Sequence, residues 1–424
     1  MSQRKVSLPY GKQTVEVLIP EANLIGTYSP TDISPVADLK AEVRRALANP
    51  IGSARLQDLV RGKQKVVFVA DDNTRLTPTD QLIPLLLDEC NQAGVSDGQI
   101  SIVIALGTHR FMTQQEIIAK FGEETVRRVV IKNHPFRDES AMVDLGVTDT
   151  GGRILINKEV YDADFKIGIG SIVPHHIPGY AGGAKIVQPG VSGEQTTAYT
   201  HLLSVRAPRS YLGVLENPVR TELDLMARKV GLNTILNTVL NRHGQVVEVF
   251  FGDVEAAFRE GVKRASQVYE VAIPEEADIV LSSSHPCDLE FWQAHKTLYP
   301  SDLAVKAGGI IIVVTPCHEG VAKTHCDILE VTPHSSTEIR NMVSAGQLHD
   351  EVAAALAIAW AQVKERETVY IVSDGICAEE AARLGFRHFA TAQAALDAAL
   401  QEKGSGARVT VLTHAPDMLP VIRK

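Results

Sequence analysis

Short apolar runs that end abruptly in polar loops constrain the first half of the chain most strongly. Lys65–Ala70 is followed at once by two aspartates, and Gln99–Leu106 by glycine, threonine and histidine. Similar runs are Val129–Lys132 and Phe165–Ile169, and helical patterns such as Thr79–Ala93 lie between the runs. This alternation predicts βαβ units, and therefore a parallel or mixed sheet covered by helices.

A second series of the same kind begins after Ala272–Glu276, where a proline and paired acids mark a boundary. Its expected strands are Asp278–Ser283, Gly309–Thr315, Val369–Ser373 and Val409–Thr413, and its expected helices include His349–Val363 and Ala392–Gln401. The chain of 424 residues is long enough for two domains. We therefore predict an α/β fold of two α/β domains, residues 1–273 and 274–424, with mainly parallel or mixed sheets and an active-site cleft between them. Residues from about 411 to 424 are expected to pack back on the N-terminal domain.

The N-terminal segment shows two further patterns. Apolar residues alternate with polar ones on both sides of Gly11, which predicts a hairpin. Ser34–Pro35 is expected to open a helix that runs to about Ala48.

Charge and apolar patterning exclude several classes of function. The chain has 42 Lys and Arg against 51 Asp and Glu, a formal net charge of −9, without a long basic cluster that would bind nucleic acid or an anionic membrane. Its longest apolar stretches are far shorter than the roughly 18 to 20 residues that span a bilayer. No apolar signal segment follows the first basic residues, and the five cysteines are scattered. A cytoplasmic location is expected.

Two of the polar loops carry side chains suited to an acid substrate. Asp72, Thr74 and Arg75 follow the first strand, and an arginine can engage two oxygens of a carboxylate or phosphate at once. His109 follows the next strand in Gly-Thr-His-Arg, and histidine is the usual general acid or base near neutral pH. The alternative interpretations are helix capping by Asp72 and Thr74 and a surface position for His109.

Residues 168–193 form the segment with the strongest functional signal. Its many glycines and prolines exclude a regular core element and let the backbone approach a ligand closely. The segment holds His175, His176 and Lys185, and a lysine whose pKa is lowered by burial can form a covalent link. No Ser or Thr follows Lys185, so the segment is not a Walker A loop. His201 follows on an expected helix, where a lone histidine is weak evidence for a ligand.

The second half of the chain offers two smaller clusters. Gln293 and Lys296 in Phe-Trp-Gln-Ala-His-Lys share one face if helical, although a solvated face with Trp292 in the core would give the same pattern. The pairs Cys317–His318 and His325–Cys326 resemble metal ligands. Their spacing is not a standard zinc pattern, and their function stays open.

Together, in this order and spacing, these segments resemble the lactate racemase family that uses a nickel-pincer nucleotide. The resemblance runs over nearly the whole chain. The matching residues are Asp72, Arg75, His109, His175, Lys185 in Gly-Gly-Ala-Lys-Ile-Val-Gln-Pro-Gly, His201, Gln293 and Lys296. It implies a two-domain α/β protein with its cofactor at the domain interface.

The family's cofactor is a pyridinium-3-thioamide-5-thiocarboxylic acid mononucleotide in which nickel sits between two sulfurs and a ring carbon. The resemblance implies that Lys185 is covalently attached to the thioamide and that His201 is the remaining nickel ligand. Imidazole and sulfur donors suit square-planar nickel. Asp72 and Thr74 are also implied beside the cofactor, and Trp360 as an aromatic residue that lines the site.

The chemistry of a 2-hydroxy acid gives these residues their expected roles. Its Cα–H is weakly acidic because the adjacent carboxylate is already charged, so removal of hydride while a base takes the hydroxyl proton avoids a carbanion. We expect His109 and His175 to be the acid and base for the two enantiomers. Arg75, Gln293 and Lys296 are expected to hold the substrate, and domain closure to exclude water. Whether His176 instead faces the substrate stays open.

Two other functions use the same residues. A zinc or iron hydrolase would take His109, His175, His176 and His201 as metal ligands. A non-catalytic protein would bind a nucleotide or an organic acid with the same loops. For the racemase, the expected partners are a small 2-hydroxy acid and the enzymes of cofactor biosynthesis, and a homo-oligomer is compatible with the sequence.

Overall fold

Six strands from the first two-thirds of the chain form one sheet in the computed structural model, which describes residues 2–423. Neighbouring strands are parallel except for β12 and β13. In spatial order they are β13 (Val246–Gly252), β12 (Thr234–Leu240), β9 (Phe165–Ser171), β4 (Val66–Asp71), β5 (Ile100–Ala105) and β6 (Val130–Asn133). Because β9, β4 and β5 are parallel neighbours, their carboxyl ends meet at one edge of the sheet. The predicted functional loops start at that edge.

The second sheet also has six strands, and all its neighbouring strands are parallel. In spatial order they are β18 (Arg387–Phe389), β17 (Thr368–Val372), β16 (Val305–Val314), β15 (Ala277–Ser283), β19 (Val409–Leu412) and β3 (Leu24–Tyr28). The two parallel or mixed sheets confirm the predicted α/β class.

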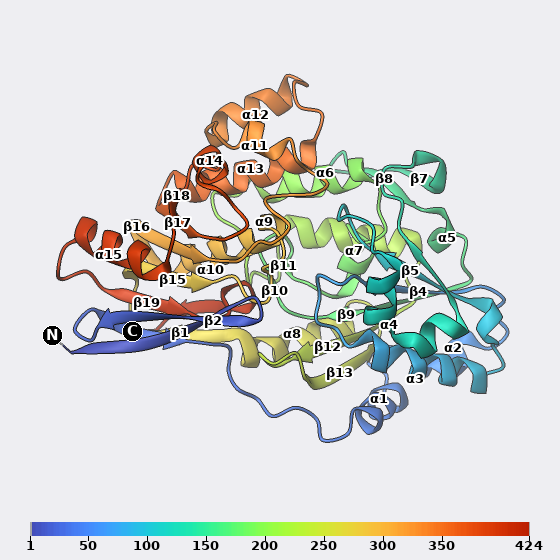
Figure 1. Ribbon diagram of the computed structural model, residues 1–424. Coiled ribbons are helices and arrows are strands. Elements are labelled where there is room, and N and C mark those ends of the chain that lie inside the picture. Colours follow the sequence, from blue (N-terminus) through green and yellow to red (C-terminus); the bar gives the residue numbers. More distant parts are fainter. Residues whose placement is uncertain (1, 424) are drawn as a thin grey trace.

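Residues 3–28 lie with this second sheet. The hairpin of β1 (Gln3–Tyr10) and β2 (Gln13–Pro20) turns at Gly11 and packs its apolar face into the core of the second sheet. In Figure 1 its two dark blue strands lie beside that sheet. The next strand, β3, completes the sheet by pairing with β19. This segment, which the prediction assigns to residues 1–273, therefore pairs with the second half of the chain, because β19 offers an edge that a distant part of the chain fills.

The far end of the chain crosses in the opposite direction. β20 (Leu419–Ile422) pairs in parallel with β14 (Glu270–Ile273), which precedes the boundary expected at residue 273. Two smaller antiparallel pairs join β7 (Met142–Val147) to β8 (Arg153–Asn157), and β10 (Pro174–His175) to β11 (Gly179–Tyr180).

Helices cover both sheets and the junction between them (Figure 1). The helices of four or more residues with α-helical geometry are α1 (Leu39–Ala48), α2 (Leu56–Val60), α3 (Thr79–Gln92), α4 (Gln114–Arg128), α5 (Lys158–Tyr161), α6 (Glu194–Ser204), α7 (Pro218–Val230), α8 (Ala256–Tyr269), α9 (Phe291–Ala294), α10 (Leu298–Ala304), α11 (Ile328–Val331), α12 (Ser336–Ser344), α13 (Glu351–Lys364), α14 (Ala378–Arg383) and α15 (Ala392–Lys403). α6 from the first half packs on α13 from the second. One hydrophobic cluster runs without a break through both halves, so the two sheets share a core.

Two observations concern single helices. The helix expected from Ser34 begins only at Leu39, because the Asp38 side chain accepts a hydrogen bond from the backbone of Ala41 and caps the helix there.

Across residues 2–423, no helix combines the length and the apolar character that crossing a membrane requires.

Candidate active site

One cavity lies at the carboxyl edge of the first sheet and is closed by residues of the second half. Its atom-free volume is about 1010 Å³, including solvent at its open side, against roughly 300–1,000 Å³ for pockets that hold drug-sized ligands. The cavity lining contains Asp72, Arg75, His109, His175, Lys185, His201, Gln293 and Lys296. Eight residues predicted from the sequence, spread over more than half of the chain, therefore meet in one place.

The loop after β4 is held in a fixed conformation by its own side chains. Asp72 Oδ1 accepts hydrogen bonds from the Thr74 amide (3.1 Å) and hydroxyl (2.6 Å), and Thr74 Oγ1 accepts from Arg75 Nη1 (2.7 Å). Lys120 of α4 donates to the carbonyls of Arg75 (2.8 Å) and Thr77 (2.9 Å). The Arg75 guanidinium is thereby directed at the cavity before any ligand arrives.

His109 and Asp72 form a partly buried pair across the ends of β5 and β4. His109 Nδ1 lies 2.6 Å from Asp72 Oδ2, and Gln293 Nε2 donates to His109 Nε2 at 3.0 Å. Burial opposes ionisation of Asp72, but His109 and Arg75 hold the pKa of Asp72 well below its usual value. Burial lowers the pKa of His109 below its usual value of about 6.5, and Asp72 offsets part of this effect. His109 is therefore a neutral imidazole with a lone pair on Nε2.

This balance predicts how His109 titrates in the apoprotein. We expect its pKa, followed by two-dimensional NMR of the imidazole nitrogens, to lie below 6.5, so that the ring is neutral through neutral pH and gains a proton only in acid. Asp72→Asn removes the charge that favours the imidazolium, so the pKa should fall further. A pKa above 6.5, or a rise in the Asn variant, would show that the ion pair outweighs burial.

The glycine-rich segment leaves β9 and folds over the cavity in the β10–β11 hairpin and a short 3-10 helix, Gly183–Ile186. The buried guanidinium of Arg220 on α7 holds it by donating to the carbonyls of Tyr180 and Gly182, while lying 4.3 Å from the centre of the Phe258 ring. A segment with little regular structure is thus held in part by one cation from the core.

Lys185 and His201 face this cavity from the 3-10 helix and from α6. Burial lowers the pKa of the Lys185 amine well below its usual value, and Arg75 and Lys296 add repulsion. Burial likewise lowers the pKa of His201 to about 3, and its buried Nδ1 has no hydrogen-bond partner within residues 2–423. Burial therefore favours the neutral, nitrogen-donor form of both side chains. The Lys185 amine suits a covalent link, and the His201 imidazole suits a metal ligand.

Gly190 allows two loops of the site to meet. Its carbonyl accepts a hydrogen bond from Gly107 at 3.0 Å, and an added Cβ would lie 2.0 Å from the Ile186 carbonyl oxygen. We expect Gly190→Ala to lower the free energy of unfolding by about 3 kcal/mol, because the backbone must shift to relieve this contact. Urea unfolding would measure the loss. Gly98→Ala is the control, since its Cβ meets nothing within 4 Å and should cost less than about 0.5 kcal/mol. Equal losses would contradict the close approach at Gly190.

His175 and His176 are both buried, and their environments differ. His175 Nδ1 accepts from the Ile177 amide at 3.2 Å, which leaves the ring proton on Nε2. His176 stacks between His175 (ring centres 4.5 Å apart) and Tyr299 (4.3 Å), and neither of its ring nitrogens has a partner among the described residues. Burial lowers the pKa of both imidazoles well below the usual value. Both histidines line the cavity, so burial does not distinguish which of them acts as the acid or base.

Gln293 joins the two halves of the site. Its Oε1 accepts from Lys296 Nζ (2.5 Å) and from Arg75 Nη1 (3.4 Å), while its amide donates to His109. Burial lowers the pKa of Lys296 to about 8, and Arg75 contributes to the shift. Gln293 and Lys296 do share one face of the short helical stretch, as their spacing predicted.

Two expected residues lie outside the cavity lining. Thr74 does not line the cavity but bridges Asp72 and Arg75, which do. Trp360, contrary to expectation, is fully buried and packs its indole on Phe291 (ring centres 5.1 Å apart) and His295 (5.3 Å). Its place at the wall is taken by Leu356, one turn earlier on α13, because that turn of the helix faces the cavity.

Several lining residues were not singled out from the sequence as site residues. Thr108, Trp292, His295 and Leu356 all line the cavity. The first three adjoin predicted residues in the chain, so proximity to a motif was the available signal. Leu356 lies in an apolar helix whose sequence marks no face as special.

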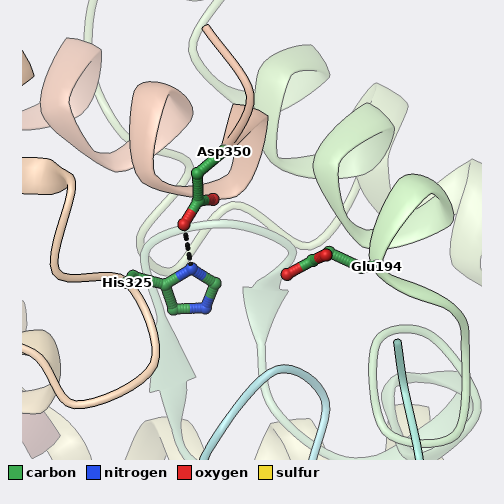
Figure 2. Close-up of side chains that lie close together, drawn as sticks. All are labelled: Glu194, His325 and Asp350. Atoms are coloured by element: carbon green, nitrogen blue, oxygen red, sulfur yellow. Dashed lines mark hydrogen bonds and ion pairs between the residues drawn. The ribbon is translucent and has the colours of Figure 1, made fainter. Parts of the chain in front are cut away.

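The cysteine and histidine pairs after β16 do not form a metal cluster. Cys317 is buried with its sulfur 3.1 Å from Thr315 Oγ1, whereas Cys326 is exposed. Across residues 2–423, the side chains close enough to share an ion are Glu194, His325 and Asp350, shown in Figure 2. The four histidines of the hydrolase alternative, His109, His175, His176 and His201, form no such group within that part of the chain.

Comparisons with known proteins agree over nearly the full length. The model of the lactate racemase N-terminal domain matches residues 10–213, and that of the lactate racemase C-terminal domain matches residues 273–422. A lactate racemase from Thermoanaerobacterium thermosaccharolyticum is 35% identical over 321 residues, which cover 74% of this chain and 75% of that protein. A lactate racemase from Lactiplantibacillus plantarum is 30% identical over 434 residues, which cover 99% of each chain.

A solved structure has the same fold. The lactate racemase apoprotein from Thermoanaerobacterium thermosaccharolyticum superimposes with a TM-score of 0.88 and 29% identity, covering 99% of this chain and 100% of the other. Two family domains in order, two relatives and one structure thus indicate the same family. The chain belongs to the lactate racemase family of isomerases.

Proposed function

We propose that the chain interconverts the two configurations at C2 of a 2-hydroxy acid, with a nickel-pincer nucleotide held by Lys185 and His201. When bound, that nucleotide supplies an electrophilic acceptor for the hydride of C2. The observation that carries the proposal is the convergence on one cavity of two cations, two imidazoles, a lysine whose pKa is lowered by burial, and a histidine whose Nδ1 has no partner among the described residues. Lactate and related 2-hydroxycarboxylates are the substrate class.

Two cationic side chains, Arg75 and Lys296, form the binding site for the substrate carboxylate. Arg75 and Lys296 both donate to the same atom, Gln293 Oε1, so an incoming carboxylate can replace the amide oxygen between them. Gln293 is then free to bond the substrate through its amide. Because Arg75 comes from the first half and Lys296 from the second, only the assembled cavity binds the acid.

The imidazoles of His109 and His175 accept and donate the proton of the substrate hydroxyl. His109 has its Nε2 lone pair available once Gln293 yields, and Asp72 stabilises the imidazolium that forms when the ring takes the proton. His175 offers an Nε2–H that can donate to the substrate oxygen. To act as the base for the second enantiomer, His175 must move its ring proton to Nδ1, in place of the hydrogen bond from Ile177.

The residues fit the implied cofactor through their donor chemistry. A neutral amine is required for a covalent thioamide link, and burial favours that form of Lys185 by lowering its pKa. A neutral imidazole is required for nickel, and His201 carries one with an unused nitrogen in the described chain. Gly170, Gly182 and Gly190 line the cavity, so part of its wall is backbone.

One experiment tests the proposal. The protein would be coexpressed with the enzymes of cofactor biosynthesis, its expected partners, and analysed by intact mass, nickel content and chiral chromatography of 2-hydroxy acids of different length and polarity. We expect an adduct on Lys185, about one nickel per chain and conversion of either enantiomer to a mixture. A loaded sample that converts none of these acids would refute the racemase and favour a protein that only binds.

A further inference from the structure

His325 is the one candidate metal ligand after β16 that is deeply buried and fully bonded. Its Nδ1 lies 2.7 Å from Asp350 Oδ2, and its Nε2 lies 3.0 Å from Thr108 Oγ1. Figure 2 shows the bond to Asp350, with Glu194 across the ring. Glu194 pairs instead with Arg137 at 2.9 Å. Since both ring nitrogens are occupied, this cluster is organised around a hydrogen-bonded imidazole rather than around an ion.

The direction of the two bonds follows from Asp350. This residue caps α13, because its Oδ1 accepts from the Ala353 amide at 2.8 Å, and its other oxygen faces His325. A carboxylate only accepts, so His325 Nδ1 carries a proton, and in the neutral ring Nε2 accepts from the Thr108 hydroxyl. A chain of two directed hydrogen bonds therefore runs from the start of α13 to the loop after β5.

This chain joins the two halves of the molecule beside the site. Thr108 precedes His109, whereas His325 and Asp350 belong to the second half. Further contacts link the same two segments: Thr324 Oγ1 donates to the Thr108 carbonyl (2.9 Å), and Arg110 donates twice to Glu319 (3.0 and 3.1 Å). The loop that carries His109 is thus fixed on both sides of that residue by one segment of the other half.

The imidazole of His325 also supports the wall of the cavity. It stacks on Trp292, with ring centres 4.1 Å apart and planes 14° from parallel. Trp292 lines the cavity and directly precedes Gln293, the residue that bonds His109 Nε2. One buried ring therefore contacts the neighbours of both members of the pair His109–Gln293.

We propose that Thr108, His325 and Asp350 form an interdomain clamp that keeps His109 aligned with Gln293, which makes His325 a positioning residue. The role in turnover rests on the proposed racemase function; the clamp itself does not. Its loss leaves the carboxylate-binding cations in place, so it should misalign the proton acceptor without weakening substrate binding.

Thr108→Val tests the clamp in the apoprotein, because valine keeps the shape of threonine and removes its hydroxyl. By hydrogen–deuterium exchange with mass spectrometry, we expect peptides covering 106–112 and 319–326 to exchange about tenfold faster, with 66–71 unchanged. Thr108→Ser, which retains the hydroxyl, should restore slow exchange. His325→Asn keeps a donor at the Nδ1 position but cannot reach Thr108, and should behave like the valine variant.

Gln362→Met provides a matched control. Gln362 on α13 donates across the same interface to the carbonyls of Val205 and Ala207, away from the clamp. Its loss should leave exchange at 106–112 unchanged. Unchanged exchange in the valine variant, or faster exchange throughout its chain, would overturn the clamp.

Steady-state kinetics of the cofactor-loaded protein complete the test. We expect Thr108→Val to lower kcat roughly 10- to 100-fold with KM within about threefold of wild type, and serine to rescue it. A rise in KM alone would overturn the positioning role. If loaded wild type racemises nothing, the proposed function fails, while the exchange result still decides whether the clamp exists.

Discussion

Lys185→Ala is expected to give a folded apoprotein without a mass adduct and with racemase activity at least about 10⁴-fold below that of the loaded wild type. Alanine has no amine to form the covalent link, and no other lysine of the site takes its position on the 3-10 helix that covers the cavity. Intact mass and nickel content after coexpression with the biosynthetic enzymes would measure the first part, and chiral chromatography the second.

Lys185→Arg is the matched control for this change. Arginine keeps a long basic side chain at the same position, but its guanidinium stays charged and does not form an amide-type link. We expect the arginine variant to lack the adduct as the alanine variant does. An adduct that persists in either variant would place the covalent attachment at another residue and remove the main chemical argument for the cofactor.

His109→Ala and His175→Ala are expected to lower kcat by about 10²- to 10⁴-fold while the adduct and the nickel remain. Each variant removes one acid or base but leaves Lys185, His201 and the carboxylate-binding cations in place. Asp72→Asn should fall in the same range, because it removes the charge that stabilises the imidazolium of His109. Rates in both directions, with nickel measured on the same samples, would test this.

His243→Ala serves as the control histidine. Its side chain is 57% exposed and it lies outside the cavity lining, so its replacement should change neither kcat nor nickel content. If both His109→Ala and His175→Ala bound ligand and nickel as wild type does and the wild type turned nothing over, the chain would be a binding protein. Loss of nickel in these variants would instead assign the histidines to the metal.

The local sequence pattern predicts much of the fold and of the site. Buried strands such as β4 and β5 were recognisable because apolar runs ended in polar loops, and their shared direction put Asp72 and His109 within one hydrogen bond of each other. The Gly-rich segment around Lys185 was recognisable because regular helices and strands of a core do not have that composition. The role of His201 needed the resemblance, since one histidine on a helix gives no signal of its own.

Long-range pairing accounts for what the sequence did not reveal. The position of β3 beside β19 depends on an edge formed nearly the whole chain later, and no local pattern encodes it. Trp360 was misplaced because an aromatic residue on an apolar helix can face either a cavity or a core. The contact between Thr108 and His325, 217 residues apart, involves residue types that occur anywhere on a surface.

The exchange of terminal strands between the halves has a consequence for biosynthesis. The hydrogen bond from Thr413 to the Tyr28 carbonyl spans 385 residues, so β3 emerges from the ribosome long before the strand beside it exists. Domains usually complete folding in the order in which they are made, whereas here β3 must wait for a strand made about 385 residues later. Until β19 has been synthesised, β3 lacks the strand with which it pairs, and β14 likewise waits for β20, so each half needs the other to complete its strand pairing.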